Sequence, residues 1–421
     1  MQIIILLFTL ILHHIRKRNY MPILFQINTV INSGSTGHIA EELGKIVMQN
    51  GWKSYIAFGR NPRPSSSKAI KVGSKLGIYY HVFLTRFFDR HGFGSYFATK
   101  KIIKQIKEIK PDVIHLHNVH GYYLNIKLLF TYFKTIDTQI VWTLHDCWSF
   151  TGHCSHYTAV ECEKWQTSCH NCVQLKQYPK SLFDNSKRNF RDKKEIFCGI
   201  KNLTLVTPSN WLAEEVRKSF LNNYPLKVIN NGVDLSVFTP NIVKKKHTIL
   251  GVASTWTDRK GFSDFIKLSD MLNNDEEIVL VGLSDKQILS LPIGKHIRGI
   301  TRTESQKELA ELYSQALCFL NLTYEDTFPT TNIESLACGT PVVTYKTGGS
   351  PEIIDSETGF VVTPGDLKGI RICIDKIKKL ESQKLVALCR KRAEQLYEKN
   401  MCFEEYMKLY KEITEKNNIK E

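Results

Sequence analysis

Two carboxylates in the second half of the chain flank a predicted helix start. Asp326 and Glu334 have seven residues between them in TYEDTFPTTNIESLACGTPVVTY. Pro329, Thr330 and Thr331 in that interval are typical of a helix N-terminus. Free N–H groups at a helix start bind diphosphates, and carboxylates hold ribose hydroxyls in α/β folds. The spacing fits a nucleotide held at two points; the alternative is an acid supporting the helix dipole beside a solvated glutamate.

Basic residues and glycines occupy further positions where a phosphate could bind. Arg259 and Lys260 follow a predicted strand in GVASTWTDRKGF, and loops after strands face the ligand crevice of an open α/β sheet. Two cations there suit a diphosphate leaving group, whereas a solvated surface pair is the simpler interpretation. In the first half, Gly34 and Gly37 open a helix in NSGSTGHIA, although a lone G-x-x-G is weak evidence for a phosphate site.

Two histidines end a predicted strand of the first half, PDVIHLHN. Strand alternation places His115 and His117 on the same face. Because His117 begins the following loop, it is the better candidate for reaching the crevice.

Five of the eleven cysteines lie in 26 residues, from Cys147 to Cys172. The odd total and the lack of an export signal argue against a disulfide framework. A terminal C-x2-C beside two further thiols suits tetrahedral zinc, while buried apolar thiols and redox chemistry are the alternatives. The predicted metal ligands are Cys154, Cys162, Cys169 and Cys172, with His153, His156 and His170 as substitutes.

Short apolar runs alternate with amphipathic stretches through both halves of the chain, which is the pattern of a parallel β–α–β sheet. We therefore expect the α/β class, with two doubly wound domains at 21–205 and 206–385. A Cys-rich insert occupies 145–175 of the first domain. KVINNGVDLSVF is expected to link the halves, and a helix over 386–421 is expected to pack back across the domains.

The first twenty residues stand apart from this pattern. MQIIILLFTLIL is too short to cross a bilayer, and Arg16, Lys17 and Arg18 follow the apolar run, whereas a secretory signal has its charges before it. We expect the first domain to start at Met21, with residues 1–20 as an over-extended reading frame or an interfacial segment. The sequence predicts no transmembrane helix.

Composition excludes some classes of protein. The 421 residues are 42% apolar and 23% charged, which excludes a small binding module and extensive disorder. The net charge of +16 indicates an anionic partner: nucleic acid, a membrane surface or a phosphorylated substrate.

Taken together, these motifs resemble the family 4 glycosyltransferases of the GT-B fold, over nearly all of the chain from Met21. The family's E-x7-E element, helix and GTPVV-like strand are matched by DTFPTTNIESLACGTPVVTY, with Asp326 in place of the first Glu. NNGVD and TGGSPEII are also similar to the family. The resemblance implies two Rossmann-like domains facing each other across a cleft. The Cys-rich insert resembles a subgroup found in bacterial polysaccharide gene clusters.

The resemblance also implies roles for individual residues. Glu334 is expected to bind ribose, Asp326 to lie near the donor sugar and Lys260 to bind the diphosphate. The family's Arg, six residues before that Lys, is replaced by Ser254, so Arg259 is a candidate to compensate. The other matches are His117, beside the donor sugar, and Gly34 and Gly37, in the first-domain glycine loop.

The resemblance implies a retaining transfer from a UDP- or GDP-sugar to a glycan or polyprenyl-diphosphate-linked acceptor in cell-surface polysaccharide biosynthesis. The sequence has no D-x-D metal motif, so we expect no catalytic cofactor. Lys260 and the helix start would stabilise the leaving group electrostatically. We favour front-side transfer, in which the leaving phosphate takes the acceptor proton. A two-step reaction with Asp326 as nucleophile is the alternative.

Most of the positive charge lies in the first half, which binds the acceptor in this family. The segment from Lys53 to Lys110 contains 13 Lys and Arg residues and two acidic residues, a net charge of +11. GIYYHVFLTRFFDRHGFG adds aromatic residues, a mixture that suits anionic lipid headgroups, with a solvated face as the alternative. We expect a cytoplasmic protein that associates peripherally with the inner face of the membrane. The acceptor-binding candidates are Asp89, Arg90 and His91.

Rival functions remain open. A nucleotide-sugar epimerase on the same fold would need no acceptor, and a metal-stabilised scaffold would not be catalytic. A basic nucleic-acid binder is disfavoured, because the cysteine spacing lacks the paired Cys and His of zinc fingers and no RNA-binding aromatic motif occurs. We therefore expect no nucleic-acid partner.

Overall fold

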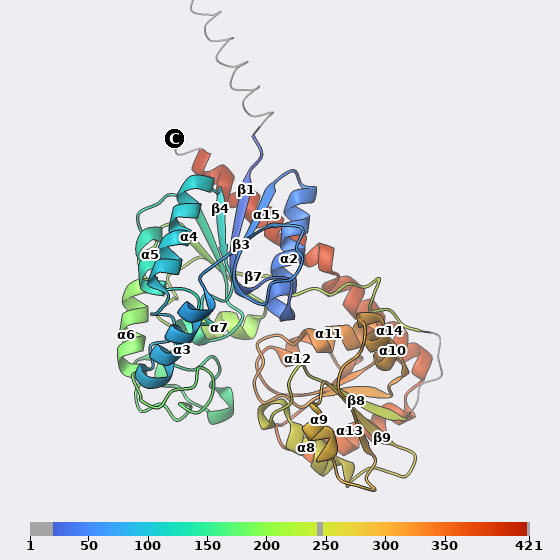
Figure 1. The fold of residues 1–421 in the computed structure, drawn as a ribbon. Helices are drawn as coiled ribbons and strands as arrows, with labels where there is room; N and C mark the ends of the chain where they lie inside the picture. Colours follow the sequence, from blue (N-terminus) through green and yellow to red (C-terminus); the bar gives the residue numbers. More distant parts are fainter. Residues whose placement is uncertain (1–19, 242–246, 419–421) are drawn as a thin grey trace, which may run out of the picture.

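The computed structural model describes residues 20–241 and 247–418, which form two α/β domains (Figure 1). Each is built on a parallel sheet with packed helices, which confirms the predicted GT-B type of architecture. The prediction for residues 1–20 concerns a segment that, apart from Tyr20, lies outside the described residues.

The first sheet has seven strands in the order β3-β2-β1-β4-β5-β6-β7. Its strands are β1 (Ile23–Val30), β2 (Lys53–Arg60), β3 (Lys68–Lys71), β4 (Val113–Leu116), β5 (Gln139–Thr143), β6 (Leu203–Thr207) and β7 (Leu226–Val228). The helices are α2 (Gly34–Gln49), α3 (Lys75–Phe88), α4 (Tyr96–Ile109), α5 (Ile126–Phe133), α6 (Ser186–Phe197) and α7 (Asn210–Lys218). Central strands such as β4 are buried throughout, because helices cover both faces.

The Cys-rich insert lies between β5 and α6. It has little regular structure, apart from short 3₁₀ turns at Trp148–Phe150, Thr158–Val160 and Lys164–Gln166. Its aromatic side chains Trp148, Phe150 and Trp165 are buried and join the core of the first domain. The insert is therefore anchored to that domain by apolar packing rather than by strand pairing.

The second sheet has six strands in the order β10-β9-β8-β11-β12-β13. They are β8 (Thr248–Val252), β9 (Glu277–Val281), β10 (Ile297–Ile300), β11 (Cys318–Asn321), β12 (Val342–Tyr345) and β13 (Gly359–Val362). The helices are α8 (Phe262–Ser269), α9 (Asp285–Leu289), α10 (Gln306–Gln315), α11 (Thr330–Ala337), α12 (Ser350–Ile353), α13 (Leu367–Lys379), α14 (Ser382–Leu396) and α15 (Lys399–Asn418).

The structure moves two predicted boundaries. The boundary between 205 and 206 falls inside β6, and β7 also belongs to the first sheet, because Leu226–Val228 pairs in parallel with Leu205–Thr207. Position 386 falls inside α14, which packs on the second domain through α11. The predicted single C-terminal helix is therefore the end of α14 followed by α15.

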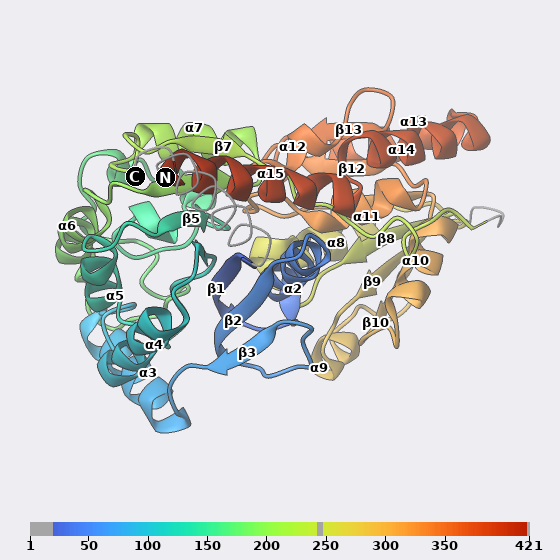
Figure 2. The ribbon, with the colours of Figure 1, turned by 90° about the horizontal axis from the view of Figure 1, so that it is seen from above.

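Helix α15 returns from the second domain to the first, where it lies beside α2 (Figures 1 and 2). Phe403, Tyr406 and Tyr410 pack there against the first-domain core, including Trp52. The two chain crossings between the domains also touch, because the Val233 N–H donates to the Tyr397 carbonyl at 2.9 Å and the Lys399 N–H to the Val233 carbonyl at 3.1 Å.

Candidate active site

The strand orders determine where the candidate residues meet. In each sheet the order reverses beside the first strand, between β1 and β4 and between β8 and β11. Ligands of open α/β sheets bind outside the carboxyl ends of the strands at such a point. Gly34 and His117 follow β1 and β4, while Lys260 and Asp326 follow β8 and β11. The fold thus places candidates from both domains at the two switch points.

Lys260 and Asp326 form an ion pair in the cleft, with Nζ 2.8 Å from Oδ2. Both side chains are about a quarter exposed. Burial acts to raise the pKa of Asp326, but Lys260, His156 and Arg259 together lower it below its ordinary value. The carboxylate is therefore ionised at neutral pH, and the ion pair fixes the ammonium group of Lys260 beside it.

Glu334 lies one turn inside α11 and accepts a hydrogen bond from the buried Tyr313 hydroxyl at 3.2 Å. Burial raises its pKa to about 7, against the opposing hydrogen bonds from Tyr313 and Thr330. Thr330 and Thr331 begin the helix and are partly exposed, with no side chain capping the N-terminus. The helix start is therefore open to an anionic ligand.

Arg259 is exposed at the cleft, and its guanidinium donates to the Glu325 carbonyl at 3.2 Å. Its own carbonyl accepts from the Tyr324 N–H at 2.9 Å, which ties the 255–260 loop to the loop after β11. Arg259 and Lys260 thus stand beside Asp326, on the same side of the cleft.

The glycine loop after β1 begins α2. Gly34 has φ +61°, which a glycine adopts without strain. A Cβ on Gly37 would meet Val30 Cγ2 at 3.1 Å and the Asn32 nitrogen at 3.3 Å, so a side chain there would make these neighbours shift by a few tenths of an ångström. The start of α2 is therefore compact, and Ser33 leaves it without a side-chain cap.

His117 does not reach the crevice as predicted, because it is only 1% exposed. Its Nδ1 lies 3.1 Å from His145 Nε2 and its Nε2 lies 3.0 Å from Gln26 Oε1. Burial and the nearby His115 and His145 hold its pKa well below the ordinary value. The partly exposed His145 stands in front of it, and the His145 carbonyl accepts from Thr327 of the second domain at 2.9 Å.

A cavity of about 710 Å³ opens between the insert and the second domain. One wall comes from the insert and the residues that follow it: Ser155, His156, Ala159, Val160, Val173, Gln174, Gln177 and Tyr178. The opposite wall comes from two second-domain loops: Thr255, Thr257, Asp258, Arg259, Tyr324 and Glu325. Its volume is in the range of small-molecule sites.

Two of the residues near these groups were missed as cleft residues by the sequence analysis. His145 follows β5 in the dipeptide His145-Asp146, and a histidine at a strand end was a usable signal. His156 lies in the irregular insert, where periodicity gives no direction for a side chain. Burial, with the nearby cations Arg259 and Lys260, lowers the pKa of His156 to about 4, against the opposing effect of the carboxylates of Asp146 and Asp326.

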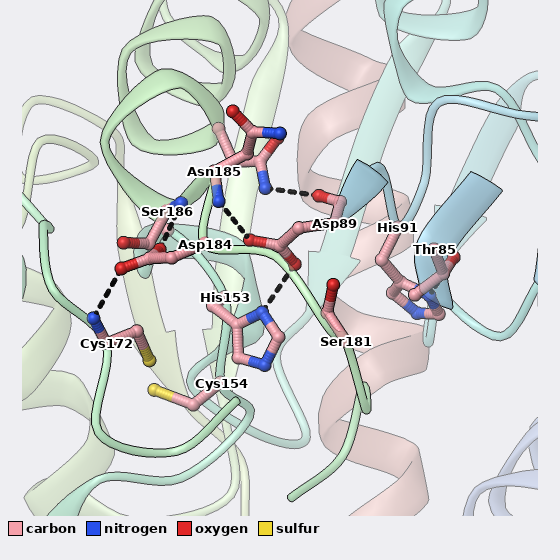
Figure 3. Close-up of polar contacts among 12 residues, drawn as sticks. Thr85, Asp89, His91, His153, Cys154, Cys172, Ser181, Asp184, Asn185 and Ser186 are labelled. Carbon is pink, nitrogen blue, oxygen red and sulfur yellow. Dashed lines mark hydrogen bonds and ion pairs between the residues drawn. The ribbon is translucent and has the colours of Figure 1, made fainter. Parts of the chain in front are cut away.

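The predicted acceptor residues are tied into the protein interior (Figure 3). Asp89 is buried, and its carboxylate accepts from His153 Nδ1 at 2.5 Å and from the Asn185 N–H at 3.0 Å. Arg90 pairs with Asp192 at 2.8 Å, and His91 is 3% exposed and accepts from the Gly121 N–H. These contacts join the end of α3 to the insert and to α6. They indicate a structural role for the three residues.

The four predicted metal ligands line one small cavity of the insert, and the thiols of Cys154 and Cys172 point toward each other (Figure 3). The hydrogen bond with Cys154 lowers the pKa of Cys172 to about 7. Buried His153 Nε2 has no hydrogen-bond partner. Within residues 20–241 and 247–418, however, no three His, Cys, Asp or Glu side chains form a set that could hold a metal ion.

None of the helices in the described ranges combines the length and the apolar character needed to cross a bilayer.

Known families match both halves of this arrangement. Residues 37–237 match the family Glycosyltransferase Family 4, and residues 237–398 match the family Glycosyl transferases group 1. The two matches meet at residue 237, after β7, where the first sheet is complete.

One relative matches nearly the whole chain and another matches about half of it. A protein named as a colanic acid biosynthesis glycosyl transferase, WcaC of Escherichia coli, is 23% identical over 93% of this chain and 100% of its own. N,N'-diacetylbacillosaminyl-diphospho-undecaprenol alpha-1,3-N-acetylgalactosaminyltransferase of Campylobacter jejuni is 24% identical over 51% of this chain and 57% of its own.

Solved structures share the fold. Sucrose-phosphate synthase of Thermosynechococcus elongatus superposes with a TM-score of 0.68 at 17% identity, covering 93% of this chain and 99% of its own. Anabaena HepE in complex with UDP-glucose superposes with a TM-score of 0.63 at 14% identity, covering 93% of this chain and 100% of its own. These structures show the GT-B fold, and the two family matches with the near-full-length relative show that the chain belongs to the family 4 glycosyltransferases.

Proposed function

We propose that the protein transfers a sugar, with retention of its anomeric configuration, from a nucleotide-diphosphate donor to a glycan or lipid-linked saccharide in cell-surface polysaccharide biosynthesis. One observation carries the proposal: Lys260 and Asp326, from the loops after the neighbouring strands β8 and β11, form an ion pair at the carboxyl edge of one sheet, and the segment of Asp326 continues into the uncapped start of α11, which bears Glu334. That edge faces the cleft formed with the first domain.

The donor would lie against the second domain. Glu334 would accept hydrogen bonds from the ribose, and the open start of α11 would receive the diphosphate together with Lys260 and Arg259. Because Asp326 already holds Lys260 in place, the cation needs little rearrangement when charge develops on the leaving group. These groups would stabilise the departing phosphate without a catalytic metal.

The transfer itself would occur on one face of the donor sugar. The bond between the anomeric carbon and the phosphate oxygen breaks, the bond to the acceptor oxygen forms on the same face, and the phosphate takes the acceptor proton. His117 would act on the donor through His145, since His117 is buried behind it. Both imidazoles are neutral at pH 7, because burial lowers each pKa.

Relatives support the choice of substrates. HepE of Anabaena was crystallised with UDP-glucose, and the Campylobacter relative is named for a diphospho-undecaprenol acceptor. WcaC is named for colanic acid, a polysaccharide. A UDP-sugar donor and a polyprenyl-diphosphate-linked acceptor are therefore the first compounds to test, with GDP-sugars as the second donor class.

A surface of the first domain supports peripheral attachment to an anionic membrane. We name as the aromatic surface the exposed apolar side chains of α3, the start of α4 and the 182–183 loop. Phe97 is 83% exposed and Leu76 is 80% exposed. The Leu182 N–H donates to the Arg86 carbonyl at 2.8 Å, so the loop is fixed beside α3. Aromatic residues among lysines and arginines suit a lipid interface.

Structural zinc in the insert stays a proposal from the cysteine spacing, since the described residues form no set of three side chains that could hold the ion. His153 is oriented by Asp89 and leaves Nε2 without a partner, as a second-shell carboxylate would arrange a metal-binding histidine. Metal analysis of protein purified under reducing conditions tests it, and Cys169→Ser should lose both zinc and thermal stability. Metal-free protein of full stability would overturn it.

The main test is a donor screen. UDP- and GDP-sugars are offered with and without a polyprenyl-diphosphate-linked saccharide, and both hydrolysis and transfer are measured. One donor class should be consumed, and the product linkage should keep the donor's anomeric configuration by NMR. Glu334→Ala should abolish transfer in a protein of unchanged melting temperature. Release of an epimerised sugar nucleotide without an acceptor would replace the proposal with an epimerase.

A further inference from the structure

The insert forms a wall of the cleft that none of the donor motifs uses. The charged residues that we propose for the donor diphosphate and ribose come from the second domain, with Lys260 and Glu334 among them. The opposite wall of the 710 Å³ cavity comes from residues 155–178 of the first domain. Since the reaction needs two substrates, this wall is available to the second one.

His156 is fixed in that wall by a hydrogen bond to its backbone carbonyl and by hydrogen bonds from the residues that follow it. Its carbonyl accepts from the buried Gln174 Nε2 at 2.7 Å. Two residues further on, the Thr158 hydroxyl donates to the Tyr324 carbonyl at 3.3 Å and the Ala159 N–H to Glu325 Oε1 at 3.2 Å. The segment that carries His156 is therefore attached directly to the second-domain loop that holds Asp326.

The ring of His156 has no hydrogen-bond partner within residues 20–241 and 247–418, and it lines the cavity. The neighbouring histidines differ: the His117, His120 and His153 rings are each bonded to a protein group. Charged groups surround His156 from both domains, with Asp146 on the first and Arg259, Lys260 and Asp326 on the second. At pH 7 the neutral ring has one N–H donor and one acceptor nitrogen to offer.

The rest of the wall has the chemistry of a sugar site. The Gln177 amide supplies a polar group at the cavity, and exposed Val160 and Val173 supply apolar contact. The Tyr178 hydroxyl lies within hydrogen-bond distance of His91 and His120, so this tyrosine lines the wall with its hydroxyl already bonded. A saccharide presents hydroxyls and apolar C–H faces, and a few placed polar groups among apolar ones are typical of a small-molecule site.

We propose that the Cys-rich insert forms the acceptor-sugar subsite of the cleft, with His156 as the residue that hydrogen-bonds the acceptor saccharide. This inference rests on the proposed glycosyl transfer and adds to it a substrate-binding role for the insert. It also replaces Asp89, Arg90 and His91 as the acceptor-binding residues.

The test uses His156→Ala in the full-length enzyme, with three measurements. We expect kcat/KM for the acceptor to fall at least tenfold, while UDP affinity by calorimetry and donor hydrolysis without acceptor stay within twofold. His247→Ala is the matched control, because His247 is about half exposed on the second domain and pairs with Asp275. It should leave all three measurements unchanged.

Each other outcome has a definite meaning. A parallel loss of UDP affinity would make His156 a donor residue, and unchanged acceptor kinetics would remove it from the subsite; both overturn the inference. If His156→Ala does not fold, Gln177→Ala at the exposed part of the wall should raise the acceptor KM at least threefold, and no change would again overturn it. Wild-type protein that neither binds nor hydrolyses a nucleotide sugar would instead refute the proposed function.

Discussion

The two halves of the cleft are built in different ways. On the donor half, Lys260 and Asp326 stand in loops after strands and Glu334 on a helix, all on the second domain. On the acceptor half, the residues chosen for their charge, Asp89 and His91, are buried, and the cavity wall is irregular insert. A side chain that follows a strand has its direction set by the sheet, whereas one in an irregular segment depends on packing that sequence does not reveal.

The largest expected effect is a loss of stability, which would show that buried Asp89 of the first domain has a structural role. Asp89→Ala leaves His153 and the Asn185 N–H without their buried acceptor. Breaking a buried pair costs about 3–5 kcal/mol, so urea unfolding should show a loss of that size. Asp192→Ala, which removes a partly exposed partner of Arg90, should cost less. Unchanged stability together with a raised acceptor KM would instead show that Asp89 binds the acceptor.

The next effect concerns catalysis on the donor half. Lys260→Ala removes the cation that faces the leaving group, and turnover should fall by about 10²- to 10³-fold, as when one preorganised donor is lost. The melting temperature should change little, since the side chain is about a quarter exposed. Lys267→Ala on α8, an exposed lysine of the same region, should keep wild-type turnover. Equal loss in both variants would contradict the assignment.

A smaller effect should appear in the pH dependence of donor binding. The pKa of Glu334 is raised to about 7, and ribose hydroxyls donate best to its ionised form. Below pH 7, binding must therefore release a proton, so donor affinity should rise about three- to tenfold from pH 6 to pH 8 and then level off. Calorimetry at several pH values measures this, and Glu334→Gln should give a flat profile. A steeper rise in the variant would exclude this carboxylate as the cause.

The smallest expected effect is a modest loss of stability from a change in the first-domain core, with no change in the chemistry of the cleft. Tyr410→Phe removes the hydroxyl that lies 2.6 Å from His115 Nδ1 in the interior. A lost buried hydrogen bond costs about 1 kcal/mol, visible as a modest drop in melting temperature. Donor hydrolysis should stay as in the wild type. Tyr80→Phe, at a position 60% exposed, is the control and should alter neither quantity.

The sequence predicted the donor half better than the acceptor half for physical reasons. Alternating apolar and amphipathic runs determine both sheets, and hence the loops that carry Lys260 and Asp326. His117 was placed correctly at a strand end, but its burial behind His145 depends on how β5 lies beside β4. Strand β7 has three residues and no period to detect. His156 could not be distinguished from the other insert histidines without the packing of the aromatic core beneath them.

The return of α15 to the first domain has a consequence for biosynthesis. The face of α2 and the sheet edge around Trp52 are covered by Tyr406 and Tyr410, which are translated after the whole second domain. Domains generally fold as units while the chain emerges from the ribosome. Here the first domain keeps an uncovered apolar face until more than 150 further residues have followed β7. We therefore expect the two domains to complete their folding together.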